Sequence, residues 1–423
     1  MRGPRAGATP PLPPGVFLRR VLLVTASPGL LAAVCLIVPT RCLAQELITL
    51  HVKAPEFPVP QPEFAPTGGG PNAPTSRPGA EPGPREAPFP NVPATTWINS
   101  PPLSLAGLRG KVVMIDFWEY TCINCIRTFP DNKRWYERYH KYGFEIIGVH
   151  DPEFDIAYPV EHVREAVKRF GLPYPVVVDD GFTIWNSYHN STWPNRFLID
   201  SKGFIRFDRP GEGADSAFEH AIQSLLEEAH PGLKFPASYT IPPEENALAP
   251  SCGVPTNEMY VGHWGDQGIL ANPEGYRDGK TIDYELPSSV EDGHAVVAGR
   301  WETDRNGMVY RGKRKQDTPS SDELKMRYHA RELYAVMNVS RGRPSRVYIV
   351  QDGKDLTGTD KGVDVETDSS GRSYIEVREA KMYYVVQNPS LGSHTVELFP
   401  TRPGLTVNSF TFGNDCQTQF PHL

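Results

Sequence analysis

Apolar runs of strand length alternate with helical stretches between residues 103 and 230. The runs Lys111–Phe117 and Phe144–His150 are almost continuously apolar, which is typical of strands buried on both faces of a sheet. The stretch Pro159–Phe170 carries apolar residues at helical spacing, and Gly171 follows it as a stop signal. Strands that alternate with helices predict a layered α/β domain. The further elements expected here are a helix over Cys122–Tyr142 that ends at Gly143, strands over Val176–Val178, Arg196–Asp200 and Phe204–Asp208, and a helix over Ala217–Ala229.

From Met259 to Phe420 the pattern changes to short alternating runs separated by Gly, Asp, Asn and Pro. Many short strands at such spacing are typical of a β-sandwich or jelly roll. We therefore expect a second, all-β domain in this part of the chain. The strands expected are Leu324–Tyr334, Arg346–Val350, Ser373–Val377, Met382–Val386 and Thr395–Phe399, with turns at Asp352-Gly353, Ser369-Ser370-Gly371 and Leu391-Gly392.

The N-terminal segment has the pattern of an export signal. Arg19 and Arg20 precede an apolar run over Val21–Val38, and small residues allow cleavage after Ala44. The arginine pair also fits a twin-arginine signal. An uncleaved membrane anchor stays open, although Ser27-Pro28-Gly29 interrupts the run. In either case most of the chain is expected outside the cytoplasm, periplasmic or secreted, and membrane-anchored if the signal is not cleaved.

Two proline-rich stretches divide the chain, whose 423 residues suit two domains. These stretches have too few apolar residues to form a core, which predicts linkers over 45–102 and 236–257. The expected division is then a signal or anchor at 1–44, the α/β domain at 103–235 and the β-sandwich domain at 258–423. The formal net charge is −7, so there is no basic excess and nucleic acid is not an expected partner.

The sequence Cys122-Ile123-Asn124-Cys125 follows a predicted buried strand and opens a predicted helix. At a helix N-terminus the unpaired backbone N–H groups and the helix dipole favour a thiolate, so Cys122 is the expected nucleophile. Cys125, one turn further on, can attack a mixed disulfide at Cys122 and release the substrate. The pattern predicts thiol–disulfide exchange, with no cofactor beyond the Cys122–Cys125 couple.

A structural zinc site and an inert disulfide are the alternatives for this pair. Zinc needs further Cys or His ligands, and the chain contains no second CxxC and no HxxxH pattern. His140 and His150 lack ligand spacing to the pair, so no metal is expected. His150 and Glu153, after the second strand, can shape the electrostatics near Cys122 or lie on a loop surface, and they are not expected to be catalytic.

The residues around the pair resemble the thioredoxin superfamily. They are Ile115-Asp116-Phe117-Trp118, Cys122-Ile123-Asn124-Cys125, Pro130 and Thr192-Trp193-Pro194. By this resemblance Asp116 is the acid that accepts the proton of Cys125, and its apolar neighbours favour burial over a position in solvent. Pro194 is expected to be a cis-proline ahead of a strand rather than an ordinary trans turn residue. Trp193 is expected to offer backbone bonds to a substrate, and Trp118 to pack and to help docking.

A closer resemblance is to the extracytoplasmic TlpA-like thioredoxins and to the C-terminal part of DipZ-type proteins. It rests on Phe117–Cys125, Gly148–Phe154, Trp193-Pro194 with Phe197–Asp200, and Gly211-Glu212-Gly213. That family follows the thioredoxin domain with a carbohydrate-binding-module-like sandwich, which Gly299–Trp301, Tyr328–Arg331 and Phe410–Gly413 match more loosely. DipZ-type proteins begin with a multi-helix membrane domain that imports electrons, and this chain has one apolar segment. The resemblance therefore implies an external electron donor, such as a membrane thiol-electron importer.

The predicted sandwich carries two further candidates. Trp264, Trp301 and Tyr328 can form a platform for a sugar ligand, although burial in the sandwich core is favoured. Cys252 and Cys416 flank the sandwich, and an exported chain is expected to join them in a structural disulfide.

The function expected from the sequence is an exported thiol–disulfide oxidoreductase that acts on protein thiols and disulfides. A thiol peroxidase is one alternative, because peroxiredoxins share the fold, although only Thr121 imitates their active-site threonine. An envelope carbohydrate-binding protein with an accessory redox domain is another.

Overall fold

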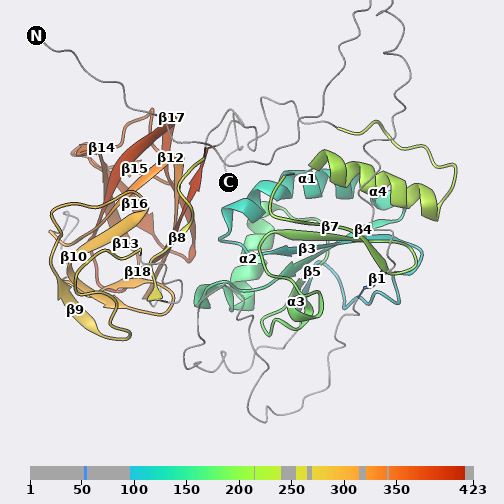
Figure 1. Ribbon diagram of the computed structural model, residues 1–423, viewed down its shortest axis with the longest axis horizontal. Coiled ribbons are helices and arrows are strands. Elements are labelled where there is room, and N and C mark those ends of the chain that lie inside the picture. Colours follow the sequence, from blue (N-terminus) through green and yellow to red (C-terminus); the bar gives the residue numbers. More distant parts are fainter. Residues whose placement is uncertain are drawn as a thin grey trace, which may run out of the picture. The chain divides into compact units, whose positions relative to one another are not determined.

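The computed structural model of the chain describes residues 52–54, 96–213, 215–239, 254–263, 269–313, 321–340 and 343–414. These residues form an α/β domain followed by an all-β domain, as the sequence predicts (Figure 1). The expected signal or anchor at 1–44 lies outside the described residues, as do Trp264, Cys252 and Cys416, so the disulfide between these cysteines stays a prediction. Among the described helices, none combines the length and the apolar character that a membrane crossing requires.

A seven-stranded mixed sheet forms the centre of the α/β domain, in the order β1-β7-β6-β3-β4-β5-β2. Its parallel strands are β3 (Val112–Trp118), β4 (Phe144–His150) and β5 (Val176–Val178), which confirm the predicted strands to within one residue. β6 (Asn195–Ile199) pairs antiparallel with β3, and β7 (Phe204–Pro210) pairs antiparallel with β6. Because the parallel strands end at one edge of the sheet, the residues that follow them gather there.

Four described α-helices cover the faces of this sheet: α1 (Ile123–Tyr139), α2 (Val160–Phe170), α3 (Thr183–Ser187) and α4 (Asp215–Ala229). Side chains of β3 point to opposite faces in turn. Met114 and Trp118 belong to one core, which contains side chains of α1, α2 and α4, whereas Ile115 and Phe117 belong to a second core with α3. The expected stops Gly143 and Gly171 have left-handed φ angles of 93° and 59°, which favour glycine.

Besides the single-turn 3₁₀ helix η2 (Asp155–Ala157), three elements of this domain are absent from the sequence prediction. β1 (Val52–Lys53) pairs with β7, and β2 (Thr96–Ile98) pairs with β5. Parts of the predicted linker 45–102 therefore belong to the sheet, and that boundary is wrong. The short helix α3 falls between two predicted strands. Strands of two or three residues and a helix of five residues are too short to show a hydrophobic period.

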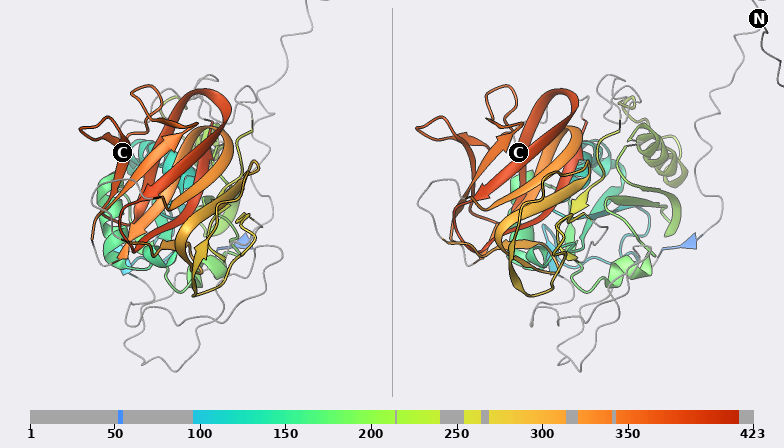
Figure 2. Two further views of the ribbon diagram at one scale, coloured as in Figure 1. Left: turned by 90° about the vertical axis from the view of Figure 1, so that its left-hand side faces the viewer. Right: turned by 60° about the vertical axis from the view of Figure 1, so that its left-hand side comes forward.

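The all-β domain is organised around its two longest strands, β12 (Glu323–Val339) and β17 (Lys381–Pro400), which lie side by side (Figure 2). The other edge of β12 pairs first with β10 (His294–Thr303) and then with β18 (Leu405–Gly413). Between these two pairings, at Ala330 and Glu332, the register of β12 against β17 also shifts, and the extra residues lie in β17. The remaining strands are β8 (Met259–Tyr260), β9 (Thr281–Tyr284), β11 (Met308–Tyr310), β13 (Ser345–Gln351), β14 (Lys354–Asp355), β15 (Glu366–Thr367) and β16 (Ser373–Val377).

Two of the three predicted turns in this domain are confirmed. Asp352 and Gly353, with φ angles of 50° and 75°, join β13 to β14. Gly371, with a φ angle of 85°, lies between β15 and β16. The turn predicted at Leu391-Gly392 is wrong, because both residues lie inside β17 and the two strands expected on either side are one strand.

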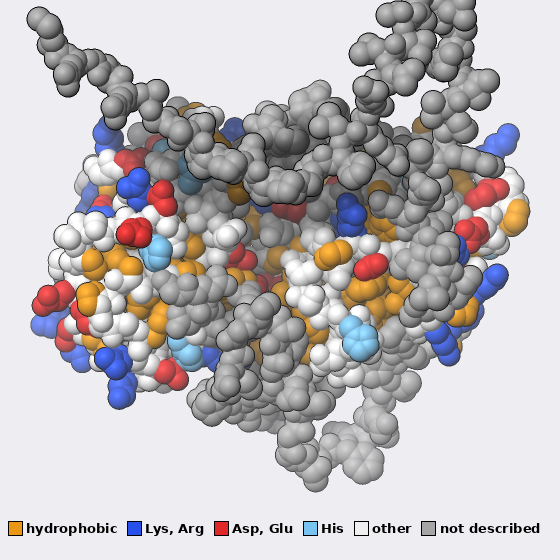
Figure 3. All heavy atoms as spheres, viewed as in Figure 1, with side chains coloured by type: hydrophobic (Ala, Val, Ile, Leu, Met, Phe, Trp, Pro, Cys, Tyr) orange, Lys and Arg blue, Asp and Glu red, His pale blue; other side chains and the backbone are white. Residues whose placement is uncertain are grey.

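Acidic and basic side chains are interspersed over the described residues on the face shown in Figure 3. Large apolar side chains with substantial exposure occur singly in the described part of the chain, at Tyr239, Val254, Leu286 and Val363. Isolated exposed apolar residues of this kind are ordinary for a folded surface.

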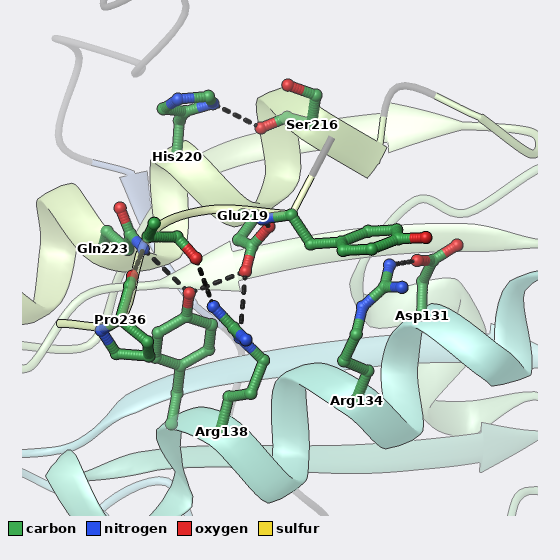
Figure 4. A network of polar contacts seen from close by, with 11 residues as sticks. Asp131, Arg134, Arg138, Ser216, Glu219, His220, Gln223 and Pro236 are labelled. Atoms are coloured by element: carbon green, nitrogen blue, oxygen red, sulfur yellow. Dashed lines mark hydrogen bonds and ion pairs between the residues drawn. The ribbon is translucent and has the colours of Figure 1, made fainter. Parts of the chain in front are cut away.

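A buried carboxylate joins α1 to α4 (Figure 4). Glu219 of α4 has no exposed area, and it accepts hydrogen bonds from the Tyr139 hydroxyl and from the Tyr239 backbone N–H, both at 2.7 Å. The Arg138 guanidinium lies 3.3 Å from the same carboxylate. The end of α1, the middle of α4 and the segment that reaches Tyr239 are therefore held by one side chain.

Glu219→Ala should destabilise the α/β domain by about 3–5 kcal/mol, because it removes the acceptor shared by a cation and two donors. Glu219→Gln keeps an acceptor oxygen and should cost less. Urea denaturation followed by circular dichroism measures both variants. Ser224→Ala, an exposed change on the same helix, is the control. A decrease in the free energy of unfolding of less than about 1 kcal/mol for Glu219→Ala would show that the carboxylate is not needed to join the helices.

Candidate active site

The predicted cysteine pair lies at the junction of β3 and α1. β3 ends at Trp118, the chain turns through Glu119–Thr121, and Cys122 is the N-cap of α1 with φ −80° and ψ 107°. The backbone N–H of Cys125 donates to Cys122 Sγ at 3.2 Å. The two cysteines form a disulfide, and their Cα atoms are 5.3 Å apart. The strand, CxxC and helix therefore follow one another as predicted.

The two cysteines differ in exposure. Cys125 has no exposed area and belongs to the core, whereas Cys122 is partly exposed and packs at the edge of that core. The first turn of α1 contains no acidic residue, so no carboxylate of that turn opposes the attraction of the helix N-terminus for an anion. A reagent from solvent can reach Cys122 and is kept away from Cys125.

Arg127 of α1 lies between two carboxylates near the pair. Its guanidinium is 3.4 Å from Glu212, in the loop after β7, and 3.4 Å from Glu332 of β12. Burial raises the pKa of Glu212, and the charge of Arg127 opposes that rise. The start of the helix that carries the cysteines is thus joined both to the Gly211-Glu212-Gly213 loop and to a residue of the all-β domain.

Asp116 lies in β3 and has no exposed area, which confirms its predicted burial. Its Oδ2 accepts a hydrogen bond from Asn132 of α1 at 2.9 Å, and its Oδ1 has no hydrogen-bond partner. Burial raises the pKa of Asp116 from 3.8 to about 7, against the smaller opposing effects of Arg196 and Asn132. A carboxyl group with such a pKa can take up and release a proton near neutral pH.

The Trp193–Pro194 peptide bond is cis, as expected. Pro194 directly precedes β6, whose first residue, Asn195, pairs with Phe117 of β3. This register places Pro194 beside the end of β3, from which the chain continues to Cys122. The Pro194 carbonyl accepts a hydrogen bond from Gly211 at 2.8 Å. The Trp193 ring is half-buried and lies 4.3 Å, centroid to centroid, from Trp185 of α3.

Three aromatic candidates are buried completely. Trp118 has no exposed area and packs against Phe129 and His150, which confirms its expected packing role. The expected role of its side chain in substrate docking is wrong, because a substrate cannot reach it. Trp301 and Tyr328 also have no exposed area and belong to the core of the all-β domain, which confirms the favoured reading for both. A sugar platform made of these two rings is therefore ruled out.

Sequence reasoning missed a group of acidic residues at the edge where the parallel strands end. Glu119, Asp151 and Asp179 directly follow β3, β4 and β5, and none has any exposed area. Burial, followed by repulsion from Asp179, raises the pKa of Asp151 well above its usual value. Burial also raises the pKa of Asp179, which accepts backbone N–H bonds from Thr183 and Trp185 at 2.8 and 2.9 Å. The sequence contains a signal for this group, because an acidic residue directly follows each of the three parallel strands.

His150 is the last residue of β4 and has no exposed area, so of its two interpretations the one as a loop-surface residue is wrong. Glu153 is partly exposed, and its carboxylate accepts a hydrogen bond from the Tyr260 hydroxyl. In the part of the chain that the structure describes, no three His, Cys, Asp or Glu side chains are grouped so that they could hold a metal ion.

Two protein families match the chain. Residues 86–208 match the AhpC/TSA family, and residues 256–413 match a family described as a thioredoxin like C-terminal domain. The first match contains the cysteine pair, Asp116 and Pro194, and the second covers the all-β domain.

Individual proteins are similar to the chain over one or both domains. Protein DipZ of Mycobacterium tuberculosis is 33% identical over 326 residues, which cover 75% of this chain and 42% of DipZ, so the chain spans less than half of that relative. Thiol-disulfide oxidoreductase ResA of Bacillus thuringiensis is 32% identical over 123 residues, which cover 29% of this chain and 68% of ResA. A solved thiol-disulfide isomerase of Corynebacterium glutamicum aligns at 26% identity and a TM-score of 0.29, over 31% of this chain and 90% of that one.

Asp116→Asn should stabilise the oxidised protein at pH 8 and change little at pH 4. The ordinary pKa of the carboxyl group is 3.8 and its pKa in the folded protein is about 7, so the wild type loses stability as the pH rises between these values. The asparagine of the variant does not titrate in this range. The free energy of unfolding of the variant should therefore exceed that of the wild type by about 4 kcal/mol at pH 8. Urea denaturation at pH 4, 6 and 8 measures the difference.

Asp208→Asn, a change of the same kind at an exposed position of β7, is the matched control for this experiment. It should leave the pH dependence of stability as in the wild type. An advantage of Asp116→Asn that is equal at all three pH values would contradict the raised pKa of Asp116.

Proposed function

Because the chain belongs to the thioredoxin-like thiol–disulfide oxidoreductases, we propose that its Cys122–Cys125 couple exchanges disulfides with protein substrates outside the cytoplasm. The observation that carries this proposal is the unequal exposure of the two cysteines. A substrate can contact Cys122 at the surface. Cys125 is buried in the core, next to Cys122, where it can attack the mixed disulfide between Cys122 and the substrate.

In the reducing direction, the Cys122 thiolate attacks one sulfur of a substrate disulfide. A bond forms between Cys122 and that sulfur, the substrate disulfide breaks, and the leaving sulfur takes up a proton. The Cys125 thiolate then attacks Cys122 Sγ, so that the Cys122–Cys125 disulfide forms and the second substrate thiol is released. The substrate gains two electrons and the dithiol loses two. The same steps in reverse oxidise a substrate dithiol.

Asp116 supports the second step. It faces α1, the helix that carries Cys125, through its hydrogen bond to Asn132. Since burial raises the pKa of Asp116 to about 7, the carboxylate can accept the proton of the Cys125 thiol without itself being a strong base. The buried thiol needs such an acceptor, because bulk water does not reach it.

The Trp193–Pro194 segment is the proposed docking edge for the substrate. It lies beside the end of β3, near the loop that leads to Cys122. An extended stretch of substrate can pair with the backbone of Trp193 and present its sulfur to Cys122. Backbone pairing is independent of substrate side chains, which suits an enzyme that acts on several proteins.

The remaining assignments rest on the sequence. The apolar run at Val21–Val38 supports export, and an external thiol-electron donor, such as a membrane importer, would regenerate the dithiol. The long all-β domain supports a role in binding a partner or a glycan, although the buried Trp301 and Tyr328 would not contact such a ligand.

Cys122→Ser should abolish insulin reduction by the full chain in the presence of dithiothreitol. Cys125→Ser should instead accumulate mixed disulfides at Cys122, because the resolving thiol is gone. Non-reducing gel electrophoresis and peptide mass spectrometry detect the trapped species. Trapping by Cys122→Ser and not by Cys125→Ser would reverse the two roles. Consumption of hydrogen peroxide at a rate above that of insulin reduction would favour the thiol peroxidase instead.

A further inference from the structure

Arg127 is a charged side chain that lies almost completely out of solvent on α1, two residues after Cys125. Its side chain is 9% exposed, and its Nη1 donates to Asn124 Oδ1, inside the CxxC sequence, at 3.3 Å. A buried cation is costly unless it is paired and hydrogen-bonded, so the groups that pair with Arg127 fix its position. The hydrogen bond to Asn124 joins that position to the segment between the two cysteines.

Glu332 of the all-β domain is one of the carboxylates that pair with Arg127, and the all-β domain also holds Glu332 in place. The Glu332 side chain is 4% exposed, and its Oε2 lies 3.4 Å from Arg127 Nη2. The Tyr334 hydroxyl donates to the same oxygen at 2.9 Å. Tyr334 is buried and stacks on Tyr384 of β17, with ring centroids 4.5 Å apart. Arg127 and Tyr334 therefore share one acceptor, which the all-β domain supplies.

The backbone of β18 passes close to this ion pair. Gly413 lies opposite Glu332 in the register of β18 and β12. A methyl group at Gly413 would overlap both the Glu332 carboxylate and the Arg127 guanidinium, so the two groups can meet because Gly413 has no side chain. The position of Arg127 thus depends on two strands of the all-β domain.

Apolar packing accompanies the ion pair. Four side chains of the all-β domain lie in or against the core that contains Cys125, namely Tyr334, Val336, Met382 and Tyr384. An exposed ion pair contributes little to structure, because water and salt compete with it. The pair of Arg127 with Glu332 is buried and lies beside packed side chains, so it can hold Arg127 in one position.

A cation near a thiol favours the thiolate, and a fixed turn keeps that thiol at the helix N-terminus. We propose that the all-β domain positions the cysteine pair: Glu332 holds Arg127, and Arg127 holds the Cys122–Cys125 turn through Asn124. Glu332 and Arg127 are positioning residues, because each acts through another residue. This inference rests on the proposed function, in which Cys122 is the attacking sulfur.

Other charged and titratable groups surround the ion pair. They are Glu212, Asp215 and Arg196 of the α/β domain and Arg331, Tyr334 and Tyr384 of the all-β domain. Burial raises the pKa of the two tyrosine hydroxyls, so both remain neutral at pH 7. Glu212 opposes the charge of Arg127 from the α/β side at 3.4 Å. Because two carboxylates oppose one cation, we expect Arg127 to change the reactivity of Cys122 by a modest amount.

The pH profile of Cys122 alkylation in the reduced full chain, read by peptide mass spectrometry, tests the positioning role. Gly413→Ala keeps every charged group, and the φ angle of Gly413 lies outside the left-handed region, so alanine fits the backbone. The added methyl group displaces two flexible side-chain ends and should separate Glu332 from Arg127. The midpoint of the profile should then rise by about half a pH unit, because Arg127 is no longer held at Asn124.

Gly358→Ala is the matched control, because Gly358 lies in an exposed turn of the same domain with open space for a methyl group. It should leave the midpoint as in the wild type. Arg127→Met should raise the midpoint at least as far as Gly413→Ala does, and the two changes together should raise it no further. The comparison of the two glycine variants decides the question even if Arg127→Met does not fold. A midpoint that is unchanged or lowered in Gly413→Ala, or a further rise in the double variant, would overturn the positioning role.

Nuclear magnetic resonance separates this inference from the proposed function. The side-chain amide resonances of Asn124 in the oxidised full chain should shift in Gly413→Ala and not in Gly358→Ala, because the hydrogen bond from Arg127 is lost. This readout does not depend on which cysteine reacts. If Cys125 proves the more reactive cysteine of the wild type, the proposed function fails and the Asn124 shift is unaffected. Unchanged Asn124 resonances in Gly413→Ala would overturn the contact itself, whatever the reactivity of the cysteines.

Discussion

The junction of β3 with α1 is the constraint on which the rest of the site depends. A strand buried on both faces ends at Trp118, and a helix begins immediately after Cys122. The first N–H groups of that helix have no partner within it, so they favour an anion at Cys122. The same helix packs its inner side on the sheet, which buries Cys125 completely. One local geometry thus produces both a reactive sulfur and a protected one.

The cost of this arrangement is a set of ionisable side chains without access to water. Asp116, Glu119, His150, Asp151 and Asp179 all have no exposed area and lie within or directly after the three parallel strands. Where a shift is resolved, burial is its largest cause and favours the neutral acid. A neutral carboxyl group costs less to bury than a carboxylate does. Asp116, whose pKa burial raises to about 7, can take up and release a proton near neutral pH beside a reaction that moves protons at each step.

The parts of the fold that the sequence predicts are those with a long, regular pattern. The runs at Lys111–Phe117 and Phe144–His150 became β3 and β4 because a buried parallel strand needs continuous apolar residues. The short strands at Val52–Lys53 and Thr96–Ile98 carry no such period, and their pairing depends on partners far away in the chain. The same limit explains Leu391-Gly392, where a local turn signal is overridden by the pairing of β17 with β12.

The site shows the same division between local and distant signals. Cys122, Cys125, Asp116 and Pro194 could be found from spacing to a strand and from resemblance, since each role depends on a local pattern. The ion pair of Arg127 with Glu332 could not, because it joins two residues that lie 205 positions apart and belong to different domains.

The central claim is that the junction exposes one cysteine of the pair and protects the other. Brief alkylation of the reduced full chain with iodoacetamide at pH 7, read by peptide mass spectrometry, measures it most directly. The account predicts that Cys122 is modified first, and that Cys125 is modified only after denaturation. Modification of Cys125 before Cys122 in the folded protein would contradict it.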